Sequence, residues 1–186
     1  FNSHVSNDVD SKIFGDALCT EMTHMASLMP SRPPISSLFF GGGTPSLMPP
    51  ILVEGLIRQA DDLFGFTDDI EITAEANPTS VEADAMLGFQ KAGVNRVSMG
   101  VQSLDDASLK FLGREHSAAD ALHALDKVKK AFNRVSIDLI YALPDQSPKA
   151  WQAMLGQALS LGLGHLSLYQ LTIEVGTVFH TRQRRG

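Results

Sequence analysis

Short apolar runs alternate with longer segments of helical periodicity along most of the 186-residue chain. The apolar runs are rich in β-branched and aromatic residues, a composition typical of buried strands. This pattern predicts strands over 37–40, 70–74, 96–99, 135–140 and 166–171.

The segments between the predicted strands carry helix-start and helix-end residues. A Ser or Thr followed three residues later by an acidic residue forms a capping box, and a glycine after the last turn closes a helix. Proline is favoured in the first turn. The start signals are Thr79 with Glu82, Ser117 with Asp120 and Ser147 with Pro148, Gly93 closes the first of these helices, and further helices are expected over 8–29 and 50–64.

The order of these elements predicts an α/β fold. Strands that are apolar almost throughout are buried on both faces, and strand–helix alternation is typical of a parallel sheet covered by helices. The pattern alone does not decide between an open, doubly wound sheet and a closed barrel. No linker, low-complexity stretch or longer repeat interrupts the alternation, so residues 1–186 are expected to form one domain.

Composition and charge weigh against nucleic acids and membranes as partners. The formal net charge is −6, whereas binding to phosphate backbones needs clustered Lys and Arg. No apolar run reaches the roughly 18 residues of a membrane span, and no signal-peptide pattern opens the chain. The basic cluster Arg182, Arg184 and Arg185 is interpreted as a solvated tail.

A single cysteine, Cys19, limits the metal and redox chemistry of this chain. One thiol forms no internal disulfide and no multi-cysteine metal site. Its place in a predicted amphipathic helix indicates a core residue. So few cysteines fit a reducing compartment, and we expect a cytoplasmic location.

Polar groups follow every predicted strand, at the ends where parallel β/α folds collect their chemistry. Leaving such groups buried without partners costs about 1–3 kcal/mol each, so we expect a polar ligand among them. The groups are Gly41-Gly42-Gly43-Thr44-Pro45 after the first strand, Glu75 and Asn77 after the second, Gly100 and Gln102 after the third, Asp138 and Tyr141 at the fourth, and Tyr169, Gln170 and Thr172 at the fifth.

Several of these residues also have a purely structural interpretation. The glycine run fits a tight turn, Glu75 a helix cap, Gln102 a turn residue, and Arg114 an exposed position. Asp138 is harder to explain, because a carboxylate between two apolar residues is costly unless it faces a polar opening or a ligand. Neither a Walker loop nor G-x-G-x-x-G is present, which weighs against phosphate and dinucleotide sites.

Five motifs, taken in order, resemble the radical S-adenosylmethionine (SAM) superfamily in its HemN/HemW branch. None is decisive alone, but their order and spacing over residues 1–177 are specific. The resemblance implies a partial TIM-like (β/α)6 barrel of parallel strands, with the first strand and the cluster loop missing. The motifs are Gly-Gly-Gly-Thr-Pro-Ser from Gly41, Glu-Ala-Asn-Pro from Glu75, Gly-Val-Gln-Ser from Gly100, Leu-Gly-Arg-Glu-His from Leu112, and Ile-Asp-Leu-Ile-Tyr-Ala-Leu-Pro from Ile137.

The resemblance also implies a SAM site. Carboxylates suit the SAM amine or ribose hydroxyls, and an arginine forms a bidentate clamp on a carboxylate. The implied SAM contacts are the backbone of Gly42, Gly43 and Thr44, the carboxylates of Glu75 and Asp138, the side chains of Gln102 and Arg114, and a backbone position at Thr172. No residue of this chain is expected to be catalytic or to ligate a metal.

The four-iron cluster of this family is expected outside the chain. The opening Phe1-Asn2-Ser3-His4 resembles the end of the family's Cys-x-x-x-Cys-x-x-Cys-Asp-Phe loop, which places three cysteines upstream. One cysteine cannot hold a [4Fe–4S] cluster. The chain also begins without Met, so we expect a fragment that cannot do the chemistry alone. In the intact protein, the reduced cluster would cleave SAM to a 5′-deoxyadenosyl radical.

Within the branch, the residue after the cluster motif favours a HemW-like haem chaperone. Coproporphyrinogen oxidases carry Cys-x-Cys there, whereas Phe1 takes that place here. The implied partners are SAM, haem or a porphyrin, and a haem-acceptor protein, with oxygen-independent coproporphyrinogen III oxidation as the alternative. A non-redox β/α-barrel ligand-binding module also stays open, and an upstream sequence without three cysteines would support it. A Rossmann-type nucleotide binder is disfavoured, because its glycine fingerprint is missing.

Overall fold

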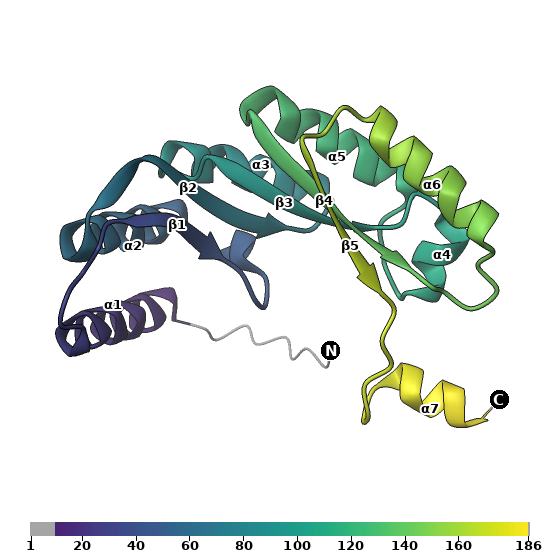
Figure 1. Ribbon diagram of the computed structural model, residues 1–186, viewed down its shortest axis with the longest axis horizontal. Coiled ribbons are helices and arrows are strands. Elements are labelled where there is room, and N and C mark those ends of the chain that lie inside the picture. The colour runs from purple at the N-terminus through teal and green to yellow at the C-terminus, as the bar shows by residue number, and fades with distance from the viewer. Residues whose placement is uncertain (1–9, 186) are drawn as a thin grey trace.

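Five parallel strands form one curled sheet. In the computed structural model, which describes residues 10–185, they pair in the order β1-β2-β3-β4-β5. Strand order follows chain order, without the reversal that defines a doubly wound sheet, and the sheet curls as part of a barrel does (Figure 1). The expected partial barrel is thereby confirmed. The strands are Ile35–Phe40 (β1), Phe66–Ala76 (β2), Arg96–Gln102 (β3), Arg134–Tyr141 (β4) and His165–Gln170 (β5).

The helices between the strands begin largely where their capping residues predict. Ser117 and Asp120 form both halves of a capping box, and the Ser147 side chain accepts from the Ala150 N–H. The opening motif from Phe1 to His4 lies outside the described residues. The helices are Ser11–Leu28 (α1), Pro50–Phe64 (α2), Ser80–Lys91 (α3), Asp106–Phe111 (α4), Ala118–Ala131 (α5), Pro148–Ser160 (α6) and Val178–Arg185 (α7), with a short 3-10 turn at Pro45–Leu47 (η1).

The capping box expected at the start of α3 is only half formed. The Thr79 hydroxyl accepts from the Glu82 N–H at 3.3 Å, as predicted. The Glu82 carboxylate does not return to Thr79, because it accepts instead from Asn77 and from the Ser46 hydroxyl. These partners come from the β2–α3 loop and from η1, so Glu82 joins two loops rather than closing its own helix.

The hydrophobic core lies between the sheet and the helices α2, α3, α5 and α6, which cover its outer face (Figure 1). In β3, the alternate residues Val97, Met99 and Val101 are 0–1% exposed. Phe89 and Met86 of α3 are fully buried in the same cluster. Burial of such side chains contributes about 1.5–3 kcal/mol each, so the packing on the outer face contributes strongly to the stability of the fold.

Three segments differ from the pattern-based expectation. Strand β2 begins at Phe66 instead of residue 70, because Phe66 pairs with Ile35 of β1 before a shift in register, and the exposed Asp68 and Asp69 lie within that irregular stretch. The short helix α4 was not expected. The arginines interpreted as a tail lie in α7, where Arg184 is exposed, and Phe179 packs against Phe111 of α4 with ring centroids 5.2 Å apart.

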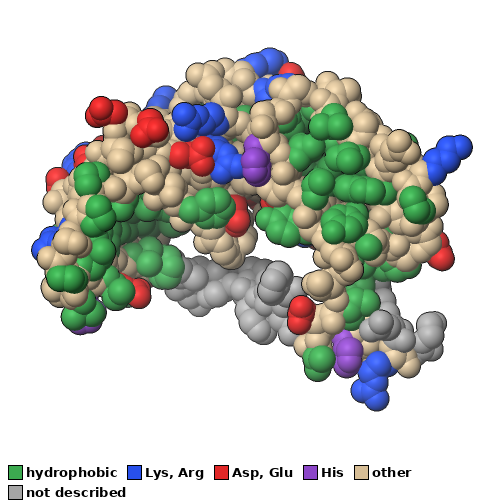
Figure 2. All heavy atoms as spheres, viewed as in Figure 1, with side chains coloured by type: hydrophobic (Ala, Val, Ile, Leu, Met, Phe, Trp, Pro, Cys, Tyr) green, Lys and Arg blue, Asp and Glu red, His purple; other side chains and the backbone are tan. Residues whose placement is uncertain are grey.

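Exposed apolar side chains gather over α1 and β1 at one end of the molecule, as Figure 2 shows. Phe14, Met25 and Phe39 are each about half exposed (49%, 52% and 56%). Within residues 10–185, no helix combines the length and apolar character needed to cross a bilayer.

Candidate functional site

The inner face of the sheet is polar, in contrast to its apolar outer face. Glu75 of β2 pairs in register with Ser98 of β3, and Ser98 pairs with Ser136 of β4. One step toward the strand ends, Asp138 of β4 pairs with Ser167 of β5. Parallel pairing keeps these side chains on the same face, because side chains alternate along each strand.

A cavity of about 310 Å³ opens where the strands end. Seven of the eight residues predicted for a ligand site line it: Gly42, Gly43, Thr44, Glu75, Gln102, Arg114 and Asp138. The convergence of Gly43, Glu75, Gln102 and Asp138 at one opening, predicted from their places at the ends of parallel strands, is confirmed.

Thr172 is the eighth residue, and the structure does not bring it to the cavity. It lies beyond the end of β5, is exposed, and is not part of the cavity wall. Its assignment to the SAM site stays a prediction.

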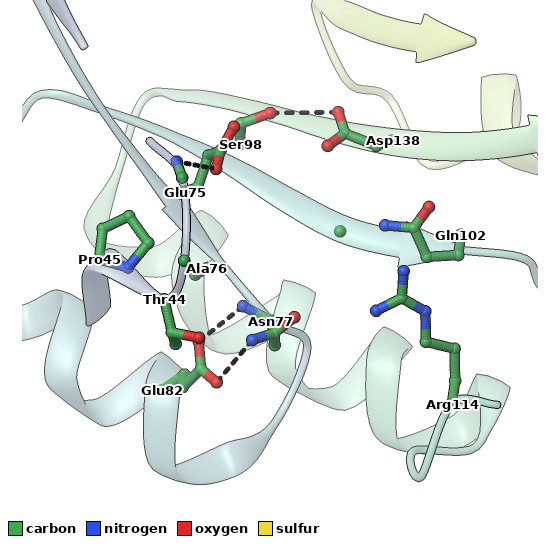
Figure 3. A pocket seen from close by; sticks show the side chains of 13 residues that line it. Thr44, Pro45, Glu75, Ala76, Asn77, Glu82, Ser98, Gln102, Arg114 and Asp138 are labelled. Atoms are coloured by element: carbon green, nitrogen blue, oxygen red, sulfur yellow. Dashed lines mark hydrogen bonds between the residues drawn. The ribbon is translucent and has the colours of Figure 1, made fainter. Parts of the chain in front are cut away.

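Glu75 joins strand β2 to the glycine loop. Its Oε2 accepts from the Gly42 backbone N–H at 3.2 Å, and the other lining groups of the loop are Gly43, Thr44 and Pro45 (Figure 3). Gly42 has φ = 81° and Gly43 has φ = 29°, a conformation that glycine adopts without strain. The carboxylate thus fixes the loop and still has acceptor positions free for a ligand.

Asp138 is half-buried in the wall of the same cavity. The Ser98 hydroxyl donates to its Oδ1 at 3.2 Å. Partial burial raises the pKa of the Asp138 carboxyl, while hydrogen bonds from Ser167 and Ser98 and the positive charges of His165 and Arg96 oppose that rise. A cationic or hydrogen-bond-donating ligand would therefore stabilise the ionised form of this carboxyl.

Gln102 is held at the cavity by a strained turn. The Ser103 N–H donates to the Val101 carbonyl at 2.8 Å, which closes a γ-turn around Gln102. Gln102 has φ = 68°, a region in which a non-glycine residue is costly. Its side chain faces Arg114 across one end of the cavity (Figure 3). Strain of this kind, kept at a cavity wall, is typical of binding residues.

Arg114 reaches the cavity from the end of α4. The Gly113 N–H donates to the Lys110 carbonyl and the Arg114 N–H to the Leu109 carbonyl, the pattern of a Schellman motif. Gly113 supplies the positive φ (71°) that this motif needs. Partial burial lowers the pKa of the Arg114 guanidinium, but an arginine stays charged at neutral pH. Arg114 therefore brings a positive charge opposite two carboxylates.

Three further residues with polar side chains line the cavity although they were not among the predicted SAM contacts: Asn77, Glu82 and Ser98. Glu82 receives hydrogen bonds from both the backbone and the side chain of Asn77, at 2.7 and 3.0 Å (Figure 3). Period-two alternation of polar residues in 96–100 would have identified Ser98, because it shares a face with Arg96 and Gly100. No comparable signal in the sequence indicates that Glu82 accepts hydrogen bonds from a neighbouring loop.

The donor and acceptor set of the cavity fits SAM better than a metal ion. Within the described part of the chain, no three His, Cys, Asp or Glu side chains group as metal ligands would. The cavity instead offers two carboxylates with free acceptor positions, Glu75 and Asp138, and one guanidinium, Arg114. SAM carries an ammonium, a sulfonium and a carboxylate, so two negative groups and one positive group complement its charges.

Comparison with protein families and curated proteins gives a consistent result. The model of the radical SAM superfamily matches residues 21–158. The chain is 41% identical to the mitochondrial radical S-adenosyl methionine domain-containing protein 1 of Mus musculus, over 100% of this chain and 42% of that protein. It is 38% identical to the heme chaperone HemW of Escherichia coli, over 98% of this chain and 48% of that protein. The chain thus spans less than half of the length of these relatives.

Solved structures share the fold. Coproporphyrinogen III oxidase (HemN) from Escherichia coli superposes with a TM-score of 0.78 at 29% identity, over 98% of this chain and 42% of that one. The Elp3 protein of the archaeon Methanocaldococcus infernus superposes with a TM-score of 0.69 over 91% of this chain and 44% of that one. At 20% identity, the Elp3 likeness extends to the fold alone.

Proposed function

Because the chain belongs to the radical SAM superfamily, we propose that its strand-end cavity binds SAM. The observation that carries the proposal is the convergence of Glu75, Asp138 and Arg114 on one cavity from three separate elements. Glu75 and Asp138 would accept from the SAM amine and ribose hydroxyls, and Arg114 would hold the methionine carboxylate. The glycine loop lets a ligand approach the backbone at Gly43 and Thr44.

The cluster of the intact protein would be bound upstream of this chain, by three cysteines before Phe1. Cys19, the single cysteine present, is half-buried on α1 and cannot provide a set of thiolate ligands. A reduced [4Fe–4S] cluster with bound SAM supplies a 5′-deoxyadenosyl radical in this superfamily. The residues described here would orient SAM and exclude water from it.

The intact protein would be a HemW-like haem chaperone, with haem or a porphyrin and a haem-acceptor protein as partners. The identity to curated HemW proteins, 34–43% for four of them, supports this assignment. The structural likeness to HemN supports coproporphyrinogen III oxidation as the second candidate. A cytoplasmic location is our proposal from the single cysteine, and the mitochondrial relatives make a mitochondrial location its alternative.

Calorimetric titration of SAM into the full-length, cluster-reconstituted protein tests the SAM site. Asp138→Asn and Glu75→Gln should each weaken binding by roughly 1.5–3 kcal/mol, because each removes a charged acceptor. Thermal melts should change far less, since both amides are near-isosteric with the acids. Unchanged SAM affinity beside a large fall in melting temperature would show that these are scaffold residues.

The cluster assignment has a separate test. A protein extended upstream of Phe1 should contain three closely spaced cysteines and turn brown after anaerobic iron–sulfur reconstitution. The 186-residue chain should stay colourless under the same treatment. A stable [4Fe–4S] cluster on the short chain would contradict the proposal, and an upstream sequence without cysteines would favour a non-redox binding module.

A further inference from the structure

A chain of hydrogen bonds crosses the inner face of the sheet from the start of β3 to the cavity at the strand ends. The Arg96 guanidinium donates to the Ser136 Oγ at 3.1 Å. The Ser136 hydroxyl donates to the Ser98 Oγ at 3.1 Å, and Ser98 donates to the Asp138 Oδ1 at 3.2 Å. Both serines are buried, Ser136 with 0% and Ser98 with 7% of its surface exposed.

The two ends of this chain fix its direction. A guanidinium only donates, so the Ser136 oxygen must accept from Arg96 and turn its own proton toward Ser98. An ionised carboxylate only accepts, so Ser98 must direct its proton to Asp138. Hydrogen bonds aligned in one direction polarise and strengthen one another. Asp138 Oδ1 thus accepts from Ser98, and this hydrogen bond favours the ionised carboxylate and opposes the rise of the Asp138 pKa that burial causes.

The Arg96 end of this hydrogen-bond chain is held by further contacts. Arg96 also donates to Glu71 Oε1 at 3.2 Å and lies 3.3 Å from His165 Nδ1. Its side chain is only 16% exposed. Arg134 Nη1 lies 3.5 Å from Oε2 of the same Glu71, but its side chain is 53% exposed, and within the described residues it forms no hydrogen bond with either serine. The second arginine therefore provides a matched control.

We propose that Arg96 is a positioning residue for the cavity ligand: through Ser136 and Ser98 it holds the Asp138 carboxylate ionised and oriented, and leaves its remaining acceptor positions to the ligand. This inference rests on the proposed SAM site. It assigns a role to three residues that lie outside the predicted ligand contacts. The other charged groups that face Asp138 are His165 on β5 and, across the cavity, Glu75 and Arg114.

The test is SAM titration into the full-length, cluster-reconstituted protein between about pH 5 and pH 9. Ser136→Ala and Arg96→Gln should each weaken binding about three- to tenfold near neutral pH, the effect of one lost hydrogen bond. As the pH is lowered, the affinity of both variants should begin to fall at a higher pH than that of the parent, because an Asp138 with fewer donors takes up its proton at a higher pH. Arg96→Lys, which keeps a charged donor, should restore most of the affinity. Arg134→Gln should stay within about twofold of the parent.

A second measurement separates this proposal from the SAM site itself. The carboxyl carbon-13 NMR signal of Asp138, followed with pH in ligand-free protein, should titrate at a higher pH in Ser136→Ala than in the parent. An unmoved titration midpoint in Ser136→Ala and Arg96→Gln would overturn the proposal, as would a moved midpoint with unchanged SAM affinity. If Asp138→Asn itself leaves SAM affinity intact, the SAM site fails, while the NMR titration still decides whether Arg96 acts on Asp138.

Discussion

The two faces of strand β3 have different roles, one apolar and packed and the other polar and hydrogen-bonded. On the outer face, Val97, Met99 and Val101 are buried against helices. On the inner face, Arg96 and Ser98 take part in a polar chain that reaches Asp138 on β4. Adjacent residues in one strand therefore serve separate tasks: the outer set stabilises the fold, and the inner set shapes a site. Substitutions on the two faces should accordingly change different measurements.

The largest effect is expected on the outer side. Phe89→Ala removes a fully buried ring from the core between α3 and the sheet. Such truncations cost about 3–5 kcal/mol of unfolding free energy. Chemical denaturation should reveal the loss, and Leu87→Ala on the same helix, where the side chain is 43% exposed, should cost far less. Equal losses at both positions would contradict the assignment of the core.

An inner-face change should lower binding and leave stability nearly intact. A Cβ at Gly100 would lie 2.8 Å from the Gln102 Nε2, so Gly100→Ala must displace the Gln102 amide from the cavity wall. We expect SAM binding to weaken by about 1–2 kcal/mol, the order of a lost hydrogen bond. Gly156→Ala on α6, where an added Cβ meets nothing within 4 Å, is the control and should slightly stabilise the helix. Unchanged SAM affinity in Gly100→Ala would remove Gln102 from the site.

A smaller, pH-dependent effect is expected from Asp138 itself. Its pKa is raised in the folded protein by partial burial, so the folded state binds this proton more tightly than the unfolded state. The contribution of Asp138 to stability is then fully present below the unfolded pKa and is lost as the pH rises through the folded pKa. Asp138→Asn should remove that dependence, and melts between about pH 3 and pH 8 should show parent and variant diverging as the pH rises. The opposite trend would mean that donors to Asp138 outweigh its burial.

The smallest effect is expected on the solvent side of the helices. Lys127 Nζ of α5 lies 2.7 Å from Asp84 Oδ1 of α3, and the two side chains are 39% and 59% exposed. Exposed pairs contribute about 0–1 kcal/mol, so Asp84→Asn should barely alter the melting temperature and should not alter SAM binding. A loss above about 1 kcal/mol would show that α3 and α5 depend on this pair more than on their buried faces.

The sequence predicts the frame of the molecule well because strand and helix periodicity are local signals. All five strands and most helix starts lie where the pattern indicates them, and seven of the residues predicted for the site meet at one cavity. Asp138 was the strongest individual signal, since a carboxylate within an apolar strand needs a polar environment.

Features that depend on tertiary proximity were not predictable. Helix α4 spans six residues, too few for a periodic pattern. Glu82 looked like a capping-box residue, but Ser46, 36 residues away, competes successfully for its carboxylate. To predict the hydrogen bonds that link Arg96 to Asp138, one must know which strands are neighbours and in which register they pair. Register is a property of the folded sheet.

The length of helix α4 sets the position of Arg114. The arginine follows the Schellman glycine directly, so its position is set by where the helix ends rather than by the reach of its side chain. Each added helical residue would turn that end by about 100° and advance it by about 1.5 Å. A one-residue insertion or deletion in Asp106–Phe111 would therefore point the guanidinium away from the cavity, even with every residue of the cavity wall unchanged. In redesigning the site, the length of this short helix should be conserved as strictly as the arginine itself.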